Sequence, residues 1–189
     1  IWVDYGFVQF GNSKRPLTKP EDFKGLKLRG YGELPSETIK ALGAAPVTMG
    51  AGEVYMALQR GTIDGQTSGT TAMYDRKMYD VTKYLTMTNH AFPEFVTSVN
   101  LKAWNKLSAE QKKIIEEAAK EVQTAIRSEV KNEEDKALKM LKEKGMQVHV
   151  IPDSEIAAWQ KATESVQSLF IKRTGDVGKK MVDFCKNLK

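Results

Sequence analysis

The sequence of 189 residues predicts an α/β fold with a substantial share of parallel strands. Three observations lead to this prediction. Short apolar–polar alternations, typical of strands, take turns with short amphipathic segments in the first half of the chain. A long stretch of helical periodicity occupies the middle, and it begins at a serine suited to cap it. One more strand pattern and further helices follow toward the C-terminus.

The strands expected in the first half are short and bounded by turn residues. They are residues 2–3, 7–10, 26–29, 46–49 and 83–89. The loop Ser13–Pro16 separates the second from the third. The third, Leu26-Lys27-Leu28-Arg29, alternates with a period of two and ends at an arginine. In sheets with parallel strands, ligands bind beyond the carboxyl ends of the strands. Arg29 occupies such an end.

Two short helices are expected between these strands. The first covers residues 35–42 and ends at Gly43, and the second covers residues 53–60 and ends at Gly61. The chain then returns toward Arg29 through a glycine-flanked segment, Gly65-Gln66-Thr67-Ser68-Gly69, which we interpret as a loop. Arg29 and this segment together predict a pocket for a small anion.

The middle of the chain predicts one long helix. Ser108 and Gln111 form a capping box, in which each side chain binds a backbone amide at the start of the helix. Apolar residues then recur at helical spacing and end at Gly145. A continuous helix over residues 109–144 would be about 54 Å long, which suits a strut between two lobes. A break near Glu133-Glu134, giving a helical hairpin, is the alternative.

The last 44 positions, from Met146 onward, predict a strand and two helices. Met146, Val148 and Val150 alternate as in a strand. Asp153 or Ser154 caps a helix that carries Trp159 and ends at Gly175, and residues 177–188 form a final amphipathic helix. The chain has one cysteine, Cys185, so an intramolecular disulfide and a cysteine-rich metal site are excluded. We expect that cysteine to be buried as a small apolar residue.

Composition excludes several classes of function. The formal net charge is +5, but the 29 basic residues are interleaved with 24 acidic ones, which is typical of solvated helix faces and not of a nucleic-acid-binding surface. No apolar stretch approaches the ~20 residues that cross a bilayer. We expect no metal site and no cofactor.

An enzyme is the competing class, and the sequence gives it little support. Ser68 lies in the glycine-flanked segment without the spacing of a nucleophile elbow, and Ser128 and Lys131 lie on a charged helix face. The chain has two histidines and one cysteine, so few catalytic pairings are available. No zinc-protease motif, phosphate loop or dinucleotide fingerprint is present. A hydrolase therefore remains only as an alternative.

Four ordered blocks carry a resemblance to a known family: FKGLKLR, ALGAAPVTMGAGEVYMALQRGTIDGQ, KMYDVTKYLTMTNH and VNLKAWNKLSAEQKKIIEEAAKE. They resemble the substrate-binding proteins of TRAP transporters, the tripartite ATP-independent periplasmic carriers of organic acids. The resemblance implies a two-lobed α/β fold of the periplasmic-binding-protein type, a helix that spans both lobes, and a periplasmic location. It also implies that the chain begins late, after the opening βα units of the first lobe.

By this comparison, residues 7–93 and 134–189 form the second lobe, and residues 1–6 and 94–133 belong to the first lobe and the connections. Crossing strands without their partner lobe expose apolar edges, which favours aggregation or pairing with a second copy of the chain. The partners implied are a small organic acid anion and the TRAP membrane subunits. A sensor module that docks on a membrane signalling protein would use the same pocket and is a second alternative.

The resemblance also implies site residues. Arg29 matches the arginine that pairs with the ligand carboxylate through its planar fork. Ser68 stands where many members have an asparagine, Ala51 where several have a stacking aromatic residue, and Val8 where some have a second arginine. These departures favour a mono-anionic acid over dicarboxylates and sialic acid. The expected ligand-binding residues are Arg29, Gln66, Thr67, Ser68, Gln9, Met49, Ala51 and His90.

Overall fold

The computed structural model describes residues 1–187 and contains two sheets surrounded by helices. The strands are β1 (Trp2–Asp4), β2 (Val8–Asn12), β3 (Lys27–Gly30), β4 (Ala45–Thr48), β5 (Gly65–Gly69), β6 (Tyr84–Ala91), β7 (Glu94–Val96) and β8 (Gln147–Val150). The helices are α1 (Glu33–Ala41), α2 (Val54–Gln59), α3 (Thr70–Asp75), α4 (Leu101–Asn105), α5 (Ala109–Glu143), α6 (Ile156–Ala162) and α7 (Glu164–Asn187). Short 3-10 turns are η1 (Pro20–Phe23), η2 (Ala51–Glu53), η3 (Met78–Asp80) and η4 (Asp153–Glu155).

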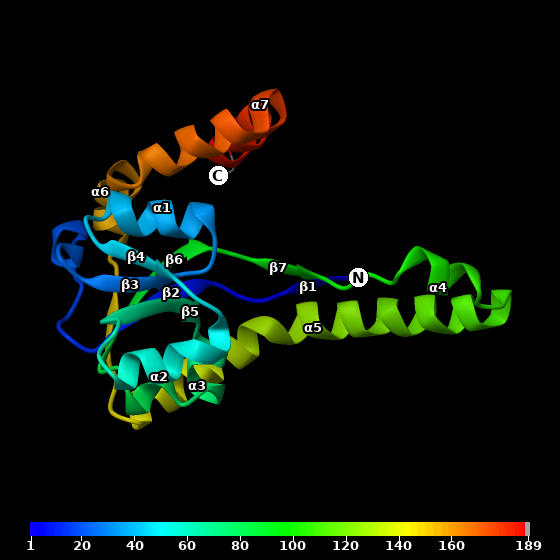
Figure 1. The fold of residues 1–189 in the computed structure, drawn as a ribbon, viewed down its shortest axis with the longest axis horizontal. Helices are drawn as coiled ribbons and strands as arrows, with labels where there is room; N and C mark the ends of the chain where they lie inside the picture. The colour runs from blue at the N-terminus through cyan, green and yellow to red at the C-terminus, as the bar shows by residue number, and fades with distance from the viewer. Residues whose placement is uncertain (188–189) are drawn as a thin grey trace.

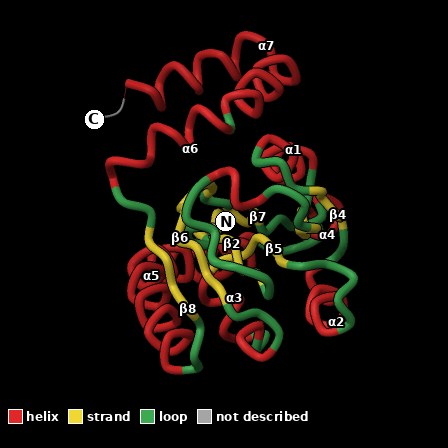
Figure 2. The backbone as a smooth tube through the Cα atoms, turned by 90° about the vertical axis from the view of Figure 1, so that its left-hand side faces the viewer, coloured by secondary structure: helices red, strands yellow, loops and turns green. Residues whose placement is uncertain are grey.

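The larger sheet is six-stranded, in the order β4-β3-β5-β2-β6-β8, and confirms the predicted α/β class. The pairs β3–β4, β3–β5 and β6–β8 are parallel, whereas β2 is antiparallel to both of its neighbours. Figure 1 shows α1, α6 and α7 on one face of this sheet and α2, α3 and the C-terminal part of α5 on the other. Figure 2 shows the same layers from the side.

Each face of the sheet has its own hydrophobic core, because successive side chains along a strand point to opposite faces. On the α1 face, Phe10 and Leu28 pack with Ile39 of α1 and Trp159 of α6. On the α2 face, Leu85 packs against α2, α3 and the base of α5 in a cluster with Val54, Met73 and Leu141. The position of a residue in its strand therefore determines on which face of the sheet its side chain lies.

The segment Gly65–Gly69 is a fully buried strand, so its prediction as a loop is wrong. It lies in the centre of the sheet, paired with β3 on one side and β2 on the other. A Cβ at Gly65 would lie only 2.5 Å from the carbonyl oxygen of Gly11, so this glycine permits close packing of neighbouring backbones. Pairing on both sides outweighs the low strand propensity of glycine and serine.

The long helix is confirmed as a single element. α5 has 35 residues without a break, and Ser108 and Gln111 form the predicted capping box. The hairpin alternative at Glu133 is therefore wrong. In Figure 1, α5 extends well beyond the larger sheet as an arm, accompanied by the β1–β7 ribbon and α4. The backbone amide of Trp2 donates to Gln123 Oε1, and Arg127 pairs with Asp4, so β1 is attached to this arm.

Apolar side chains lie exposed on the arm. Trp2, Phe95 and Val96 of the ribbon and Ile114 of α5 are each more than half exposed. Whether two copies of the chain associate through this surface stays a prediction.

The C-terminal region differs from its prediction in two respects. The helix carrying Trp159 ends at Ala162, where Thr163 leaves the helical conformation and its hydroxyl donates to the Trp159 carbonyl. α7 consists of two helices that meet at Gly175, where the backbone is not helical (φ 64°, ψ −143°), so the predicted helix end at Gly175 is confirmed. Cys185 is exposed, so its prediction as a buried residue is wrong, because the outer face of α7 has no neighbour in the described chain. Leu188, at the end of the predicted last helix, lies outside the described residues.

The crossing from β1 of the ribbon to β2 of the larger sheet passes through Gly6. Gly6 has a φ of 89°, and the next amide, that of Phe7, donates to Glu134 Oε1 of α5 at 2.6 Å. A Cβ on Gly6 would lie 2.5 Å from that carboxylate oxygen. Burial raises the pKa of Glu134, while the hydrogen bond from Phe7 lowers it. The glycine thus allows the chain to turn beneath the helix.

We expect Gly6→Ala to destabilise the fold by about 1–3 kcal/mol, since a left-handed backbone conformation is strained for alanine. Gly61→Ala is the matched control, because Gly61 also has positive φ but no atom within 4 Å of its would-be Cβ. Urea unfolding of both variants measures the difference. The larger loss should occur at Gly6 and should shrink when Glu134→Ala is added. Equal losses at the two glycines would contradict the role of the Glu134 contact.

Candidate functional site

Arg29 lies near the carboxyl end of β3 and is only 8% exposed. Its Nε donates to the Met49 carbonyl at 3.1 Å, and its Nη1 donates to the Thr67 carbonyl at 3.3 Å. Within residues 1–187 no Asp or Glu oxygen lies within ion-pair distance of its guanidinium, and Nη2 has no hydrogen-bond partner. Arg29 therefore has no carboxylate partner among the described residues.

The surroundings of Arg29 are unfavourable to its own charge. Burial lowers the pKa of Arg29, the positive charge of Arg76 lowers it further, and Tyr31 and Tyr5 act in the opposite direction. The guanidinium remains protonated in spite of this, because arginine does not lose its proton in proteins. Its central carbon lies 5.3 Å from the centre of the Tyr31 ring, a cation–π contact. A buried cation without an anionic partner favours the binding of an anion.

The strand register brings Gln66 directly beside Arg29. Leu28 pairs with Gly65 and Arg29 with Gln66 across β3 and β5, so Arg29 and Gln66 point to the same face, opposite Leu28. Gln66 is 2% exposed, and its Nε2 has no hydrogen-bond partner within the described residues. Buried amides rarely lack a partner. Gln66 therefore supplies a free donor next to the arginine.

Ser68 follows on the same face of β5, two residues beyond Gln66. Its hydroxyl lies 3.1 Å from the hydroxyl of Tyr5, and the backbone amide of Gly69 donates to the Tyr5 hydroxyl at 3.4 Å. Tyr5 reaches this position from the crossing segment between β1 and β2, where its ring packs edge-on against Phe95. A pair of hydroxyl groups thus lies on β5 and the crossing segment, on the strand next to that of Arg29.

Gln9 has its polar atoms engaged within the sheet. Its Oε1 accepts the amides of Thr88 and Asn89, and its Nε2 donates to Asn89 Oδ1 at 2.6 Å. These bonds fill the irregularity where the register of β2 against β6 shifts between Val8 and Phe10. The Gln9 side chain therefore stabilises the pairing of β2 with β6. A contact between Gln9 and the ligand stays a prediction, and these hydrogen bonds do not favour it.

His90 is separated from Arg29 by the sheet. Its ring stacks on Phe10 with the centres 4.4 Å apart, and Phe10 belongs to the core on the face opposite Arg29. Its Nδ1 lies 2.6 Å from the Thr88 hydroxyl. Burial lowers the pKa of His90 from 6.5 to about 4. A contact between His90 and the ligand stays a prediction. The position of His90 on the face opposite Arg29 does not favour it.

This pKa leads to a pH dependence of stability. Because the folded state resists protonation of His90, the unfolded state binds more protons between about pH 6.5 and pH 4. The contribution of the neutral His90 ring to the free energy of unfolding should be fully present above pH 6.5. It should decrease by up to about 3 kcal/mol as the pH falls to 4. Urea unfolding at a series of pH values should show a flatter dependence in His90→Gln than in His149→Gln. The same slope in both variants would contradict the assignment.

Of the remaining predicted residues, Thr67 and Met49 bond the Arg29 side chain through their carbonyls. Thr67 is buried, its hydroxyl donates to the Arg29 carbonyl, and its own carbonyl accepts Nη1. The Met49 carbonyl accepts Nε, and Ala51 begins the turn η2 just beyond β4. Both Met49 and Ala51 are partly exposed at the carboxyl edge of the sheet.

Two residues of this region, Tyr31 and Tyr5, were not predicted from the sequence. Tyr31 could have been found, because it lies two positions after Arg29 and so continues the same face of the strand. Tyr5 gives no local signal, since its contact with Ser68 spans 63 positions of sequence.

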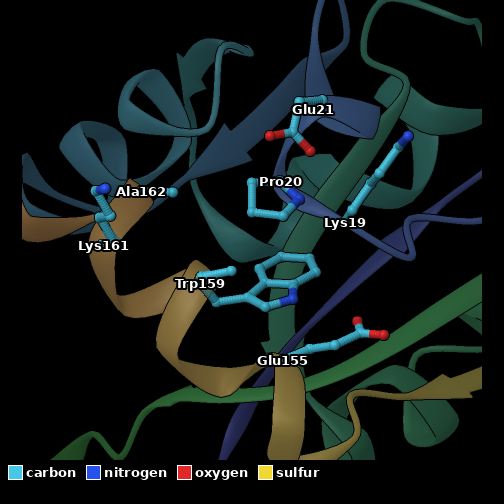
Figure 3. Close-up of a pocket in the computed structure, with 8 residues that line it drawn as sticks. Lys19, Pro20, Glu21, Glu155, Trp159, Lys161 and Ala162 are labelled. Carbon is cyan, nitrogen blue, oxygen red and sulfur yellow. The ribbon is translucent and has the colours of Figure 1, made fainter.

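One hollow of the surface lies away from Arg29. A cavity of about 440 Å³ lies between η1 and α6, lined by Lys19, Glu21, Glu155, Trp159 and neighbouring residues. Figure 3 shows the Trp159 ring at its base with two lysines and two glutamates around it. Trp159 belongs to the core on the α1 face, opposite Arg29. Arg29 and its neighbours lie on the other face of the sheet.

No three histidine, cysteine, aspartate or glutamate side chains of residues 1–187 are grouped so as to hold a metal ion. None of the helices described combines the length and hydrophobicity required to span a bilayer.

Comparison with known proteins identifies related sequences over nearly the whole chain. Residues 1–173 match the family model "Bacterial extracellular solute-binding protein, family 7". The C4-dicarboxylate-binding periplasmic protein of Rhodobacter capsulatus is 34% identical over 91% of this chain and 52% of its own length. The sialic acid-binding periplasmic protein of Vibrio cholerae is 34% identical over 94% of this chain and 54% of its own. The chain thus spans about half the length of these relatives.

Solved structures agree with the sequence matches. A TRAP periplasmic solute-binding protein from Polaromonas, bound to D-erythronate, aligns with a TM-score of 0.88 at 31% identity, over 100% of this chain and 61% of its own. One from Sulfurospirillum deleyianum, bound to succinate, aligns with a TM-score of 0.89 at 29% identity, over 96% of this chain and 61% of its own. The predicted fold class is confirmed by these alignments.

Proposed function

Because this chain belongs to family 7 of the bacterial extracellular solute-binding proteins, we propose that it forms one side of a cleft that captures a small organic acid anion. In this proposal the captured acid is delivered to the membrane subunits of a TRAP transporter, and the protein acts in the periplasm. The family consists of solute-binding components of transport systems, which argues against the hydrolase alternative.

The observation that carries this proposal is Arg29, a buried guanidinium without a carboxylate partner in the described chain. Its Nε and one Nη1 hydrogen are fixed by the carbonyls of Met49 and Thr67, so the fork is held in a defined orientation. Its remaining donors, on Nη1 and Nη2, suit two parallel hydrogen bonds to a carboxylate. A ligand carboxylate would then neutralise a charge that burial makes unfavourable.

Gln66 and the hydroxyl group of Ser68 complete the set of residues that we propose to contact the ligand. Gln66 Nε2 is an unpartnered donor in the described chain, and Ser68 is on the same face of β5. Thr67, Met49 and Ala51 support the site through backbone position.

The proposed division of the chain follows the same logic. Residues 7–93 and 134–189 form the lobe that carries Arg29, and residues 1–6 and 94–133 belong to the connections and the opposing lobe. The exposed apolar side chains of the arm, such as Trp2 and Ile114, support this division because they leave a surface that further chain could cover.

Nuclear magnetic resonance titration of the isotope-labelled chain tests the proposal, since it detects weak binding and reports on single groups. On adding a four-carbon carboxylate such as butyrate, we expect shifts at the Arg29 Nε–H and the Gln66 side-chain amide. Shifts confined to the Trp159 cavity, with both of these signals unmoved, would place the anion elsewhere and overturn the proposal.

A further inference from the structure

The hydroxyl pair formed by Tyr5 and Ser68 is not explained by the capture of a carboxylate. The two oxygens lie 3.1 Å apart, and the Tyr5 oxygen also accepts the Gly69 amide at 3.4 Å. Ser68 is buried, while Tyr5 is partly exposed. A Cβ at Gly69 would lie 3.0 Å from the Tyr5 ring, so glycine there leaves the ring room to reach Ser68.

The pair lies beside the guanidinium of Arg29. Nη1 of Arg29 donates to the carbonyl of Thr67, the residue immediately before Ser68, which brings the guanidinium to this point of β5. Tyr5 also acts to raise the pKa of Arg29. A molecule whose carboxylate binds Arg29 therefore presents its next few atoms to the two hydroxyl groups.

We propose that Tyr5 and Ser68 recognise a hydroxyl group of the bound acid, so that the site selects hydroxylated monocarboxylic acids over plain fatty acids and dicarboxylates. This inference rests on the proposed function of Arg29. A hydroxyl group both donates and accepts, as do the Tyr5 and Ser68 hydroxyls, so it can join their hydrogen bond without leaving any oxygen unpaired.

A second carboxylate suits the same position poorly. It is acceptor-only when ionised, and the pair that it would meet carries no charge. Removing a carboxylate from water without a cationic partner is costly. An aliphatic chain is also disfavoured there, because it would cover the two hydroxyls without bonding to them. The uncharged pair thus discriminates by hydrogen bonding and not by size.

Three acids with four carbons each test the inference: D-erythronate, butyrate and succinate. In magnetic resonance titrations of the unmodified chain, we expect erythronate to bind more tightly than the other two. Tyr5→Phe and Ser68→Ala should each reduce the erythronate affinity about 3–10-fold, the effect of one or two neutral hydrogen bonds. The affinity for butyrate should stay about the same. Tyr31→Phe is the matched control, since it removes a neighbouring hydroxyl but keeps the ring against Arg29.

The outcomes separate this inference from the function on which it rests. If erythronate keeps its advantage over butyrate in both Tyr5→Phe and Ser68→Ala, the hydroxyl pair does not select the ligand and the inference is wrong. If Arg29→Ala leaves the binding of all three acids unchanged, the proposed function itself fails. An advantage lost equally in Tyr31→Phe would also overturn the assignment to Tyr5. The spectra report the fold of each variant directly.

Discussion

Replacing Arg29 by alanine is expected to reduce the affinity for the organic acid at least about 30-fold. The ligand carboxylate would lose a charge-assisted, bidentate partner in a buried position, and removal of one partner of such a pair costs about 2–5 kcal/mol. Arg29→Lys should restore little, because a lysine ammonium is a point charge that cannot reproduce the two parallel hydrogen bonds of the guanidinium. Titration of each variant with D-erythronate or butyrate measures the effect.

The fold should survive these substitutions, since Arg29 forms no ion pair within residues 1–187 that its loss would break. The carbonyls of Met49 and Thr67 lose a donor each, at a cost of about 1–3 kcal/mol per buried group. Arg29→Met is a second variant, because the methionine side chain fills most of the volume of the arginine while removing its charge. Arg60→Ala, an exposed arginine at the end of α2, is the control for general loss of positive charge. Unchanged affinity in a folded Arg29→Ala chain would make Arg29 a structural residue.

Local sequence signals predicted much of the fold because the elements concerned are stabilised locally. The strand ending at Arg29 showed its period of two, and α5 showed its capping box at Ser108 and its apolar spacing. Helix ends at Gly43 and Gly61 followed from the positive φ that glycine adopts there. In each case the residues that determine the element lie within a few positions of it.

β5 was mistaken for a loop because its identity is decided by its neighbours. Its sequence begins and ends with glycine and contains Ser68, which favour turns, yet β2 and β3 bond to it on both sides. The same limitation applies to Cys185, whose exposure depends on what packs against α7, and not on its own amphipathic pattern.

The candidate site was predictable only at its centre. Arg29 and Gln66 follow from strand ends and register, whereas Tyr5 reaches Ser68 from a distant segment. Gln9 and His90 were predicted to contact ligand from their matches to the family pattern. In the structure, the Gln9 side chain bonds to Asn89 at the bulge between β2 and β6. The His90 ring stacks on Phe10, on the face of the sheet opposite Arg29. Sequence position alone does not tell on which face of an irregular strand a side chain emerges.

Proline in place of Ala125 is expected to have the largest effect on the arm. Ala125 is exposed, so the substitution removes no packing, but it deletes the amide that bonds four residues back in the middle of α5. An interior proline costs about 3 kcal/mol or more. Gln123 and Arg127, on either side of it, hold Trp2 and Asp4 of β1. A kink there should therefore loosen the ribbon as well as the helix.

Ala109→Pro is the matched control, since Ala109 is the first residue of α5, where the amide has no helical partner and proline is well tolerated. Ser108 before it already has an extended backbone, with ψ of 164°, which a following proline favours. Hydrogen exchange of the amides of residues 113–130 and far-ultraviolet circular dichroism measure the result. We expect faster exchange and lost helicity in Ala125→Pro only. Equal behaviour of the two variants would mean that the outer half of α5 frays independently, and that the helix does not act as a rigid strut.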